Sequence, residues 1–286
     1  MSEEKPEPGI SNSLSGSRFL EGNASGADWR EPAHYNTLLN SDRHCWAGEW
    51  LRRNPTFLAD LREARCNPPD ESGHILCDQD CRLSRWGVRY CRIDGEAVFF
   101  WLPECNPLVL SVEAEPHADK SNAFDCRQCP LFRAVVRGDD GQHFLFSDGA
   151  RHLQLAVTEG DALTGPALLS CTLCGLKDFE IKPLTLQRLC RLARSGRLLK
   201  SLYPPERRAR RWIEMLRAFD GAEFGASQRD IAAVLYGDRA VREGWEAGFL
   251  RTRIQRLLSG ARTMVRGGYR RLLDPEEKGR PGRVKG

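Results

Sequence analysis

The sequence has no run of about 18 consecutive apolar residues, the length that a membrane-spanning helix requires. Its opening stretch, MSEEKPEPGISNSLSGS, is acidic and polar and has no apolar centre, so we expect no secretory signal peptide. Both absences predict a protein that makes no membrane contact. We therefore expect it in the cytoplasm, associated with the nucleoid.

Signatures of common enzyme families are also missing. The sequence has no glycine-rich phosphate-binding loop, no zinc-protease motif and no kinase motif. His143 and His152 have no carboxylate or serine nearby at a spacing that indicates catalysis. The stretches GDDGQ and SDGA are typical of hairpin turns rather than of acid–base chemistry. We therefore predict a protein that is not an enzyme and needs no cofactor.

The cysteines do not indicate a disulfide framework. There are 11, an odd number, spread through a chain without an export signal. Two CxxC pairs, Cys126/Cys129 and Cys171/Cys174, offer four thiolates for a zinc ion. The pairs are separated by 41 residues, whereas compact zinc ribbons have about 15–20. We expect no metal site, and a zinc-dependent scaffold or redox sensor stays as an alternative.

Charge divides the chain into two unlike parts. Residues 182–286 contain 25 Lys and Arg against 11 Asp and Glu, a net charge of +14. Residues 1–181 contain 18 against 28, a net charge of −10. A basic C-terminal region is typical of a domain that binds a polyanion such as DNA. The acidic front is expected to bind something else.

The sequence predicts an α+β protein of about two domains with terminal tails. Its tryptophan-rich N-terminal helical segment is expected to dock on the middle of the chain or on another subunit. The middle alternates with a period of two, which predicts strands separated by Asp-Gly turns. The predicted parts are a disordered tail (1–25), a helical regulator domain (26–66), a small antiparallel β-domain (75–178), a helical DNA-binding domain (182–273) and a disordered basic tail (274–286).

A basic helix is predicted after Pro183. Its expected inner face holds Leu186, Leu189, Cys190 and Ala193. Its expected outer face holds Arg188, Arg191, Arg194 and Arg197. A further helix, ERRARRWIEMLRAF, follows the break at residues 203–205 and begins with four clustered arginines. This cluster is interpreted as a phosphate clamp, with a solvated face as the alternative.

A helix-turn-helix is predicted within residues 227–267. Ser227 can cap its first helix, Asp230 favours the positive end of that helix, and Gly237 ends it. The second helix is expected from near Trp245 to Gly267, with an apolar stripe at helical spacing. The connection between these helices is longer than the usual turn of 3–4 residues.

The outer face of that second helix contains no acidic residue. It carries arginines, a glutamine and short hydroxyls, which are the groups that contact base edges and phosphates. A solvated amphipathic helix, the alternative, usually mixes glutamate with arginine. The candidate DNA-binding residues are Arg207, Arg208, Arg210, Arg211, Gln228, Arg229, Arg251, Thr252, Gln255, Arg256, Ser259, Arg262, Thr263 and Arg266.

Several stretches resemble a known family. The segments LTGPALL, KPLTLQRL, PPERRARRW, GASQRDIAAVLYG and GARTMVRGGYRRLL resemble the RovC-like DNA-binding domain of bacterial transcription regulators. DWREPAHY and WAGEWLRRNP resemble the small N-terminal regulator domain often joined to it. The CxxC pairs lie outside this family pattern.

The resemblance implies a sequence-specific activator of excision or transfer genes on integrative and conjugative elements, or of a secretion-system promoter. It implies double-stranded promoter DNA as the partner, together with RNA polymerase and a small antiactivator protein. A homo-oligomer is also expected. The alternative is an accessory factor of site-specific recombination that shapes DNA without recruiting polymerase.

Overall fold

The computed structural model describes residues 28–64, 74–76, 81–93, 97–119 and 121–274. Nearly all of both predicted tails lies outside these residues. Within them the chain combines helices at both ends with a sheet in the middle, which confirms the α+β class. No helix in these ranges has the length and the apolar character needed to cross a membrane.

The N-terminal segment forms short helices with well-defined caps. Asp42 accepts a hydrogen bond from the backbone N–H of Cys45, and Asn54 caps the next helix from its side chain. Trp29, Trp46 and Trp50 are all buried, so the tryptophans are packing anchors. The elements are η1 (Pro32–Asn40), α1 (Arg43–Leu51) and α2 (Pro55–Glu63).

The six-stranded sheet has the strand order β1-β5-β6-β7-β4-β8. The predicted hairpins β5–β6 and β6–β7 are confirmed. The prediction of a purely antiparallel sheet is wrong in two places, because β1 pairs parallel to β5 and β4 pairs parallel to β7. The strands are β1 (His74–Leu76), β4 (Leu110–Pro116), β5 (Phe132–Gly138), β6 (Gly141–Ser147), β7 (His152–Gly160) and β8 (Ala167–Ser170).

A two-stranded ribbon joins the sheet to the helices. It consists of β2 (Val88–Arg92) and β3 (Val98–Trp101), preceded by the short helix α3 (Cys81–Ser84). One face of the ribbon packs with the helical core through Phe99 and Trp101. Phe100, on the other face, packs with side chains of β5 and β6. Side chains on β3 alternate between its two faces, so one face packs on the helical core and the other on the sheet.

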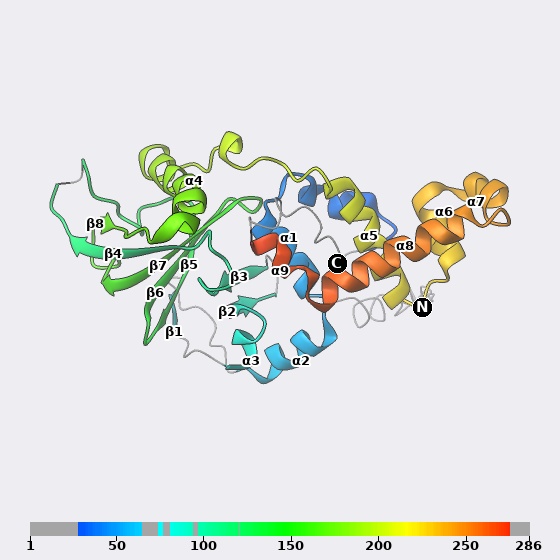
Figure 1. Cartoon of the computed structure of the whole chain (residues 1–286), viewed down its shortest axis with the longest axis horizontal. Helices are drawn as coiled ribbons and strands as arrows, with labels where there is room; N and C mark the ends of the chain where they lie inside the picture. Colours follow the sequence, from blue (N-terminus) through cyan, green and yellow to red (C-terminus); the bar gives the residue numbers. More distant parts are fainter. Residues whose placement is uncertain (1–27, 65–73, 77–80, 94–96, 120, 275–286) are drawn as a thin grey trace, which may run out of the picture.

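Helix α4 (Gly175–Ser195) begins earlier than predicted and carries Pro183 inside it. It lies over the sheet (Figure 1), where Leu189 and Leu192 join the core of the sheet. Its predicted phase is partly wrong: Cys190 and Ala193 are exposed, whereas Arg188 is buried. The face of α4 that is buried is the one that contacts the sheet.

Arg188 is satisfied in its buried position. Its Nε and Nη2 atoms donate to the carbonyl of Leu202 at 3.1 and 2.8 Å. Its guanidinium lies 4.0 Å from the ring centroid of Tyr203. An arginine that donates to a carbonyl and stacks on an aromatic ring can be buried at modest cost, which a helical pattern alone does not reveal.

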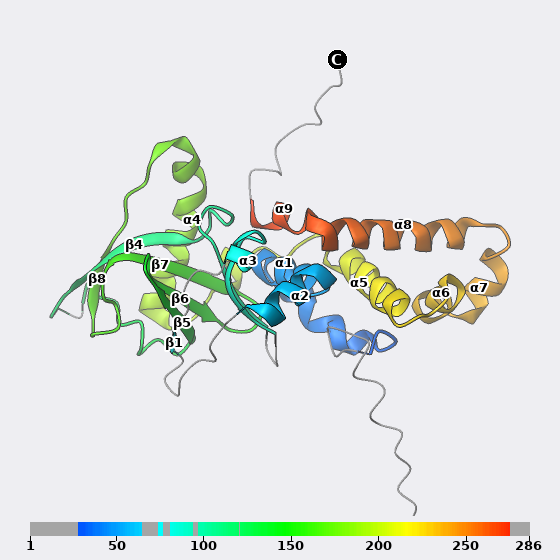
Figure 2. The ribbon, with the colours of Figure 1, turned by 90° about the horizontal axis from the view of Figure 1, so that it is seen from below.

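The C-terminal helices form an extended arm. Helix α8 runs from the centre of the molecule to its far end, where α6 and α7 lie beside it (Figure 2). Helix α5 packs along α8 and also contacts α6 and η1. The elements are η2 (Lys200–Leu202), α5 (Ala209–Glu223), α6 (Gln228–Tyr236), α7 (Asp238–Gly244), α8 (Phe249–Thr263), the π-turn η3 (Met264–Gly268) and α9 (Arg270–Leu273).

The N-terminal segment docks mainly on these C-terminal helices rather than on the sheet. Trp46 and Trp50 share one hydrophobic core with Trp212 of α5 and Tyr269 next to α9. A contact with the sheet also exists, because Asp42 accepts a hydrogen bond from the backbone N–H of His152 at 2.6 Å. The N-terminal and C-terminal helices therefore build one unit, with the sheet attached to it.

Candidate nucleic-acid interface

Helix α6 has the predicted start and end. The Ser227 side chain accepts a hydrogen bond from the backbone N–H of Asp230, and the Asp230 carboxylate accepts one in return from the backbone N–H of Ser227. The hydrogen bonds from Ser227 hold the pKa of Asp230 below its usual range. Gly237 ends the helix with a φ of +86°, which favours glycine.

The long connection predicted after Gly237 is itself a helix. Residues Asp238–Gly244 form α7, and α8 begins at Phe249 rather than near Trp245. Helix α7 spans two turns and buries only Val241 and Gly244. So short an element shows little apolar periodicity, which is why the sequence pattern did not reveal it.

Helix α8 has the predicted inner stripe. The six apolar residues predicted for this stripe, five on α8 and Val265 on the adjoining η3, are each at most 4% exposed, and α8 packs against α5 and α6. The predicted outer residues are all exposed. The buried residues are Leu250, Ile254, Leu257, Leu258, Ala261 and Val265, and the exposed ones are Arg251, Thr252, Gln255, Arg256, Ser259, Arg262, Thr263 and Arg266.

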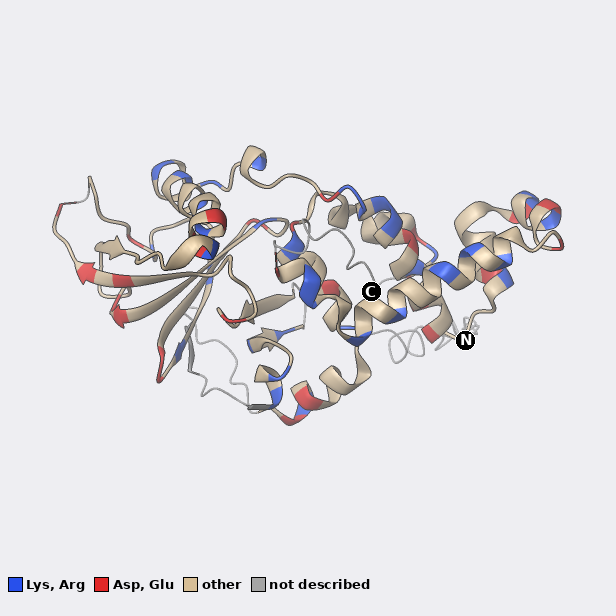
Figure 3. Cartoon of the chain, viewed as in Figure 1, with Lys and Arg blue, Asp and Glu red and all other residues tan. Residues whose placement is uncertain are grey.

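The charge on α7 differs from that on α8. On α7, Arg239 pairs with Glu243 at 2.9 Å, and Asp238 and Arg242 complete a balanced set. This mixture is typical of a solvated helix. Helix α8 contains no acidic residue, and in Figure 3 its basic residues lie beside those at the start of α5. Of the two, α8 suits a polyanion better.

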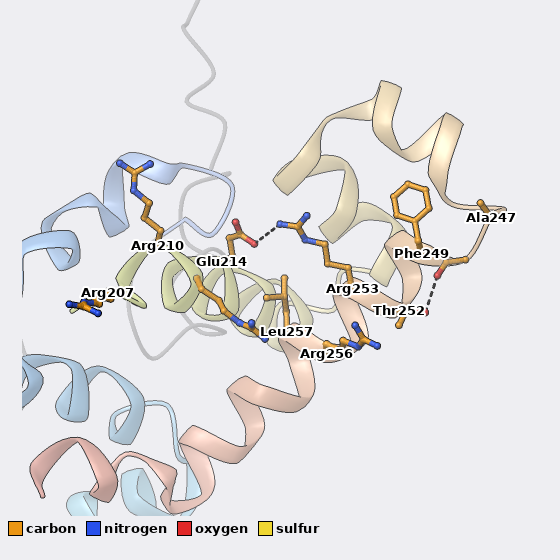
Figure 4. Close-up of a pocket in the computed structure, with 11 residues that line it drawn as sticks. Arg207, Arg210, Glu214, Ala247, Phe249, Thr252, Arg253, Arg256 and Leu257 are labelled. Carbon is orange, nitrogen blue, oxygen red and sulfur yellow. Dashed lines mark hydrogen bonds and ion pairs between the residues drawn. The ribbon is translucent and has the colours of Figure 1, made fainter. Parts of the chain in front are cut away.

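The two predicted basic regions meet in one groove. The groove is open, measures about 950 Å³, and lies between the start of α5 and the N-terminal half of α8 (Figure 4). We call it the arginine groove. It is lined by Arg207, Arg210, Arg211, Glu214, Ala247, Gly248, Phe249, Thr252, Arg253, Arg256 and Leu257.

Four of the five arginines that line the groove have guanidinium groups without a partner among the described residues. Within the described part of the chain, Arg207, Arg210, Arg211 and Arg256 make no side-chain hydrogen bond or ion pair. Arg253 differs, because it pairs with Glu214 at 3.3 Å. The groove therefore presents several donors to an anion at no cost in broken internal contacts.

Three charged or aromatic residues that line the groove were not among the candidates from the sequence. Arg253 and Glu214 are far apart in the chain and meet only because α8 packs on α5. Spacing within one helix could not reveal that pair. Phe249 was also missed; its side chain is 61% exposed at the start of α8.

Other candidate residues lie outside the arginine groove. Gln228 and Arg229 are on α6, and Arg208 does not line the groove. Thr263 also lies outside the groove, whereas Thr252 lines it. The hydroxyls of Thr252 and Thr263 donate to carbonyls one turn earlier in their own helix, at 3.0 and 2.9 Å. The remaining outer residues do not line the groove: Arg251, Gln255, Ser259 and Arg262 on α8, and Arg266 on η3.

Family comparisons match both ends of the chain. Residues 178–274 match the family described as a T6SS transcription factor DNA-binding domain, the RovC-like domain. This part of the chain is therefore a RovC-like DNA-binding domain. Residues 28–91 match a proteobacterial transcriptional regulator-like domain. The protein is therefore a DNA-binding transcriptional regulator. No curated protein matches the sequence.

The arginine groove lies entirely inside the matched RovC-like domain. The far end of α8 in this domain is anchored by the regulator-like domain. Asn54 donates a hydrogen bond to the carbonyl of Val265 at 3.0 Å, and the Tyr269 hydroxyl donates to the carbonyl of Trp86 at 2.8 Å. Between these anchors Gly267 has a φ of +139°, which turns the chain after α8. The regulator-like domain thus anchors the C-terminal end of α8, while the groove lies beside its N-terminal half, which packs on α5 and α6.

A polar cluster outside the RovC-like domain corrects one expectation. His152, taken as lacking a carboxylate partner, contacts Asp42 through Nδ1 at 3.2 Å. Its ring stacks on His44 at 4.5 Å between centroids. His143 likewise lies 3.4 Å from Asp140. Asp42 comes from a segment 110 residues away, so sequence spacing could not reveal it.

The CxxC pairs are poorly placed for metal or redox chemistry. Cys126 and Cys129 are buried in the core of the sheet, whereas Cys174 is exposed. Burial raises the pKa of Cys126 to about 12 and also raises that of Cys129, which disfavours the thiolates that bind zinc. No group of three metal-binding side chains occurs in the portions of the chain that the structure covers.

We expect protein treated with a strong chelator to keep its melting temperature and its affinity for DNA, because the buried thiols of Cys126 and Cys129 pack as apolar groups. Metal analysis and thermal unfolding before and after chelation measure this. One tightly bound zinc ion per chain, with unfolding on its removal, would contradict the expectation.

Proposed function

We propose that the protein is a sequence-specific transcription activator that binds promoter DNA through the arginine groove and the outer face of α8. The observation that supports this most is the meeting of two basic regions, at Arg207–Arg211 and on α8, in one open groove. An exposed helix with arginine, glutamine and hydroxyl side chains, free of acids, fits the major groove of DNA. This role needs no catalysis and no cofactor.

In this proposal each helix makes a different kind of contact with DNA. Arg207, Arg208, Arg210 and Arg211 contact phosphates and set the register, because phosphate contacts carry no base information. Base contacts come from the N-terminal half of α8. Helix α6 adds further contacts with phosphates. The α8 residues are Arg251, Thr252, Gln255, Arg256, Ser259, Arg262 and Thr263, with Arg266 following on η3, and those of α6 are Gln228 and Arg229.

The proposed targets are genes for excision or transfer of a mobile element, or a secretion-system promoter, with action at the nucleoid in the cytoplasm. RNA polymerase, a small antiactivator protein and a second copy of the chain are the proposed further partners. The proposed division into domains keeps residues 26–66, 75–178 and 182–273. Helix α4 crosses the boundary between the last two ranges, and it packs on the sheet.

A reporter experiment tests activation. Sites bound by the protein in its host, found by chromatin immunoprecipitation, are placed before a reporter gene. The wild-type protein is expected to raise transcription, and Arg256→Ala is expected to lose most of that effect while remaining folded. DNA binding without any change in transcription would instead support the alternative, an accessory factor of recombination.

Replacing Arg207 and Arg208 with alanine is expected to weaken binding of all DNA sequences alike, since both are placed against phosphates. Titration of the double variant with a preferred and a scrambled duplex measures this. Arg239→Ala is the matched control, because Arg239 is exposed on α7 and paired with Glu243. A changed sequence preference at unchanged total affinity would contradict a phosphate role.

A further inference from the structure

Glu214 is the one acidic side chain among the described residues that line the arginine groove. It lies on α5 one turn after Arg210 and Arg211. Its Oε2 atom accepts a hydrogen bond from the Tyr236 hydroxyl at 3.0 Å and another from Arg253 Nη2 at 3.3 Å. One carboxylate therefore joins α5, α6 and α8 at the groove.

Arg253 is held from two sides by this arrangement. Its guanidinium carbon lies 4.3 Å from the ring centroid of Tyr236, and Glu214 holds the Nη2 atom. Burial and the neighbouring Glu214 carboxylate raise the pKa of Tyr236 to about 12, which keeps its hydroxyl protonated and able to donate. The Arg253 side chain is still 54% exposed, so it remains available to a ligand in the groove.

The carboxylate has two opposite effects on DNA binding. It repels phosphates that enter the groove, because like charges a few ångströms apart interact unfavourably. It also fixes the direction of Arg253, and an oriented arginine can form the paired hydrogen bonds that identify a guanine. The first effect lowers the affinity for any DNA, and the second raises the preference for one sequence.

We propose that Glu214 is a specificity-determining positioning residue: it orients Arg253 against Tyr236 for contact with a guanine edge and keeps phosphates away from that part of the groove. This inference rests on the proposed function, DNA binding by the same groove. It adds Arg253 to the base-contacting residues and gives the single acid of the groove a role.

The test uses the full-length protein and two duplexes: one enriched by the wild-type protein from a random library, and a scrambled version of it. Glu214→Ala is expected to bind the scrambled duplex more tightly, and the affinity ratio of the two duplexes is expected to fall roughly ten-fold. Arg253→Ala should lower the ratio by the same factor. The double variant should lower it no further, because both changes remove one interaction.

Glu214→Gln is the matched control, since an amide oxygen still accepts from Tyr236 and Arg253 without the negative charge. It should bind the scrambled duplex more tightly and keep most of the ratio. A wild-type ratio in Glu214→Ala, or equal weakening on both duplexes together with a lower melting temperature, would overturn the proposal. If the wild-type protein enriches no duplex, the role of Glu214 fails, whereas salt-dependent binding of unselected DNA decides the proposed function separately.

Discussion

Asp220→Ala is expected to lower the free energy of unfolding by about 3–5 kcal/mol, because it removes one partner of a buried ion pair. The Asp220 carboxylate on α5 accepts from Arg53 Nε at 2.7 Å and from Nη2 at 2.8 Å. The Tyr35 hydroxyl donates to the same carboxylate at 2.7 Å. Both charged side chains are 2% exposed, so alanine leaves Arg53 buried with Glu49 as its remaining acidic partner.

Urea unfolding of the full chain measures this loss. Arg239→Ala, which breaks an exposed pair on α7, is the control and should change stability by about 0.5 kcal/mol or less. Replacing both partners, as Arg53→Met with Asp220→Leu, should recover much of the stability, because no uncompensated charge is then buried. A loss below about 1 kcal/mol in Asp220→Ala would mean that this contact does not hold the two ends of the chain together.

Ile254→Ala is expected to lower the free energy of unfolding by about 2–5 kcal/mol. Ile254 is fully buried on the inner stripe of α8 and does not line the arginine groove. Its neighbour Arg256 is exposed on the other side of the same helix. Arg256→Ala should leave stability within about 0.5 kcal/mol of the wild type. It should cost about 1–3 kcal/mol of affinity for the preferred site, with relaxed preference at one position.

These two variants separate folding from recognition on one helix. Unfolding curves and titrations with preferred and scrambled duplexes are recorded for both. At a temperature where Ile254→Ala is folded, its affinity ratio between the duplexes should equal that of the wild type. An unchanged ratio in Arg256→Ala would show that Arg256 contacts no base. The same result for Gln255→Ala would move the recognition role to α6, where Arg229 is the next candidate.

Local features of the sequence predicted the parts of the site that one helix defines. The capping box of Ser227 and Asp230 sets the start of α6, and the period of the apolar residues from Leu250 to Val265 sets the inner face of α8. Both signals lie within a few turns of chain. For the same reason the exposure of the arginines on α8 was predictable from the sequence.

Features that depend on packing between distant segments were not predictable. The phase of α4 follows from its contact with the sheet, which buries Arg188 against Tyr203. The parallel pairing of β4 with β7 leaves no mark on the alternation of either strand. The partners of Asp220 and of Glu214 come from other helices, so no spacing within one helix encodes them.

The docking of the N-terminal helices on the C-terminal helices supports the arginine groove. The core that Trp46 and Trp50 form with α5 also holds the far end of α8 through Val265. The arginine groove is built by α5 and α8, so its geometry depends on the N-terminal helices. Tests of DNA binding therefore need a chain that includes the N-terminal helices.

The most direct test of the central claim, DNA binding by the arginine groove, is a salt titration of the full-length protein with double-stranded DNA. Each neutralised phosphate contributes about −0.9 to the slope of log K against log salt. We expect a steep negative slope for the wild type, less steep by about 1.8 in the variant with Arg207 and Arg211 both changed to alanine. Arg239→Ala should keep the wild-type slope. A slope near zero, or equal slopes in the wild type and the groove variant, would contradict the claim.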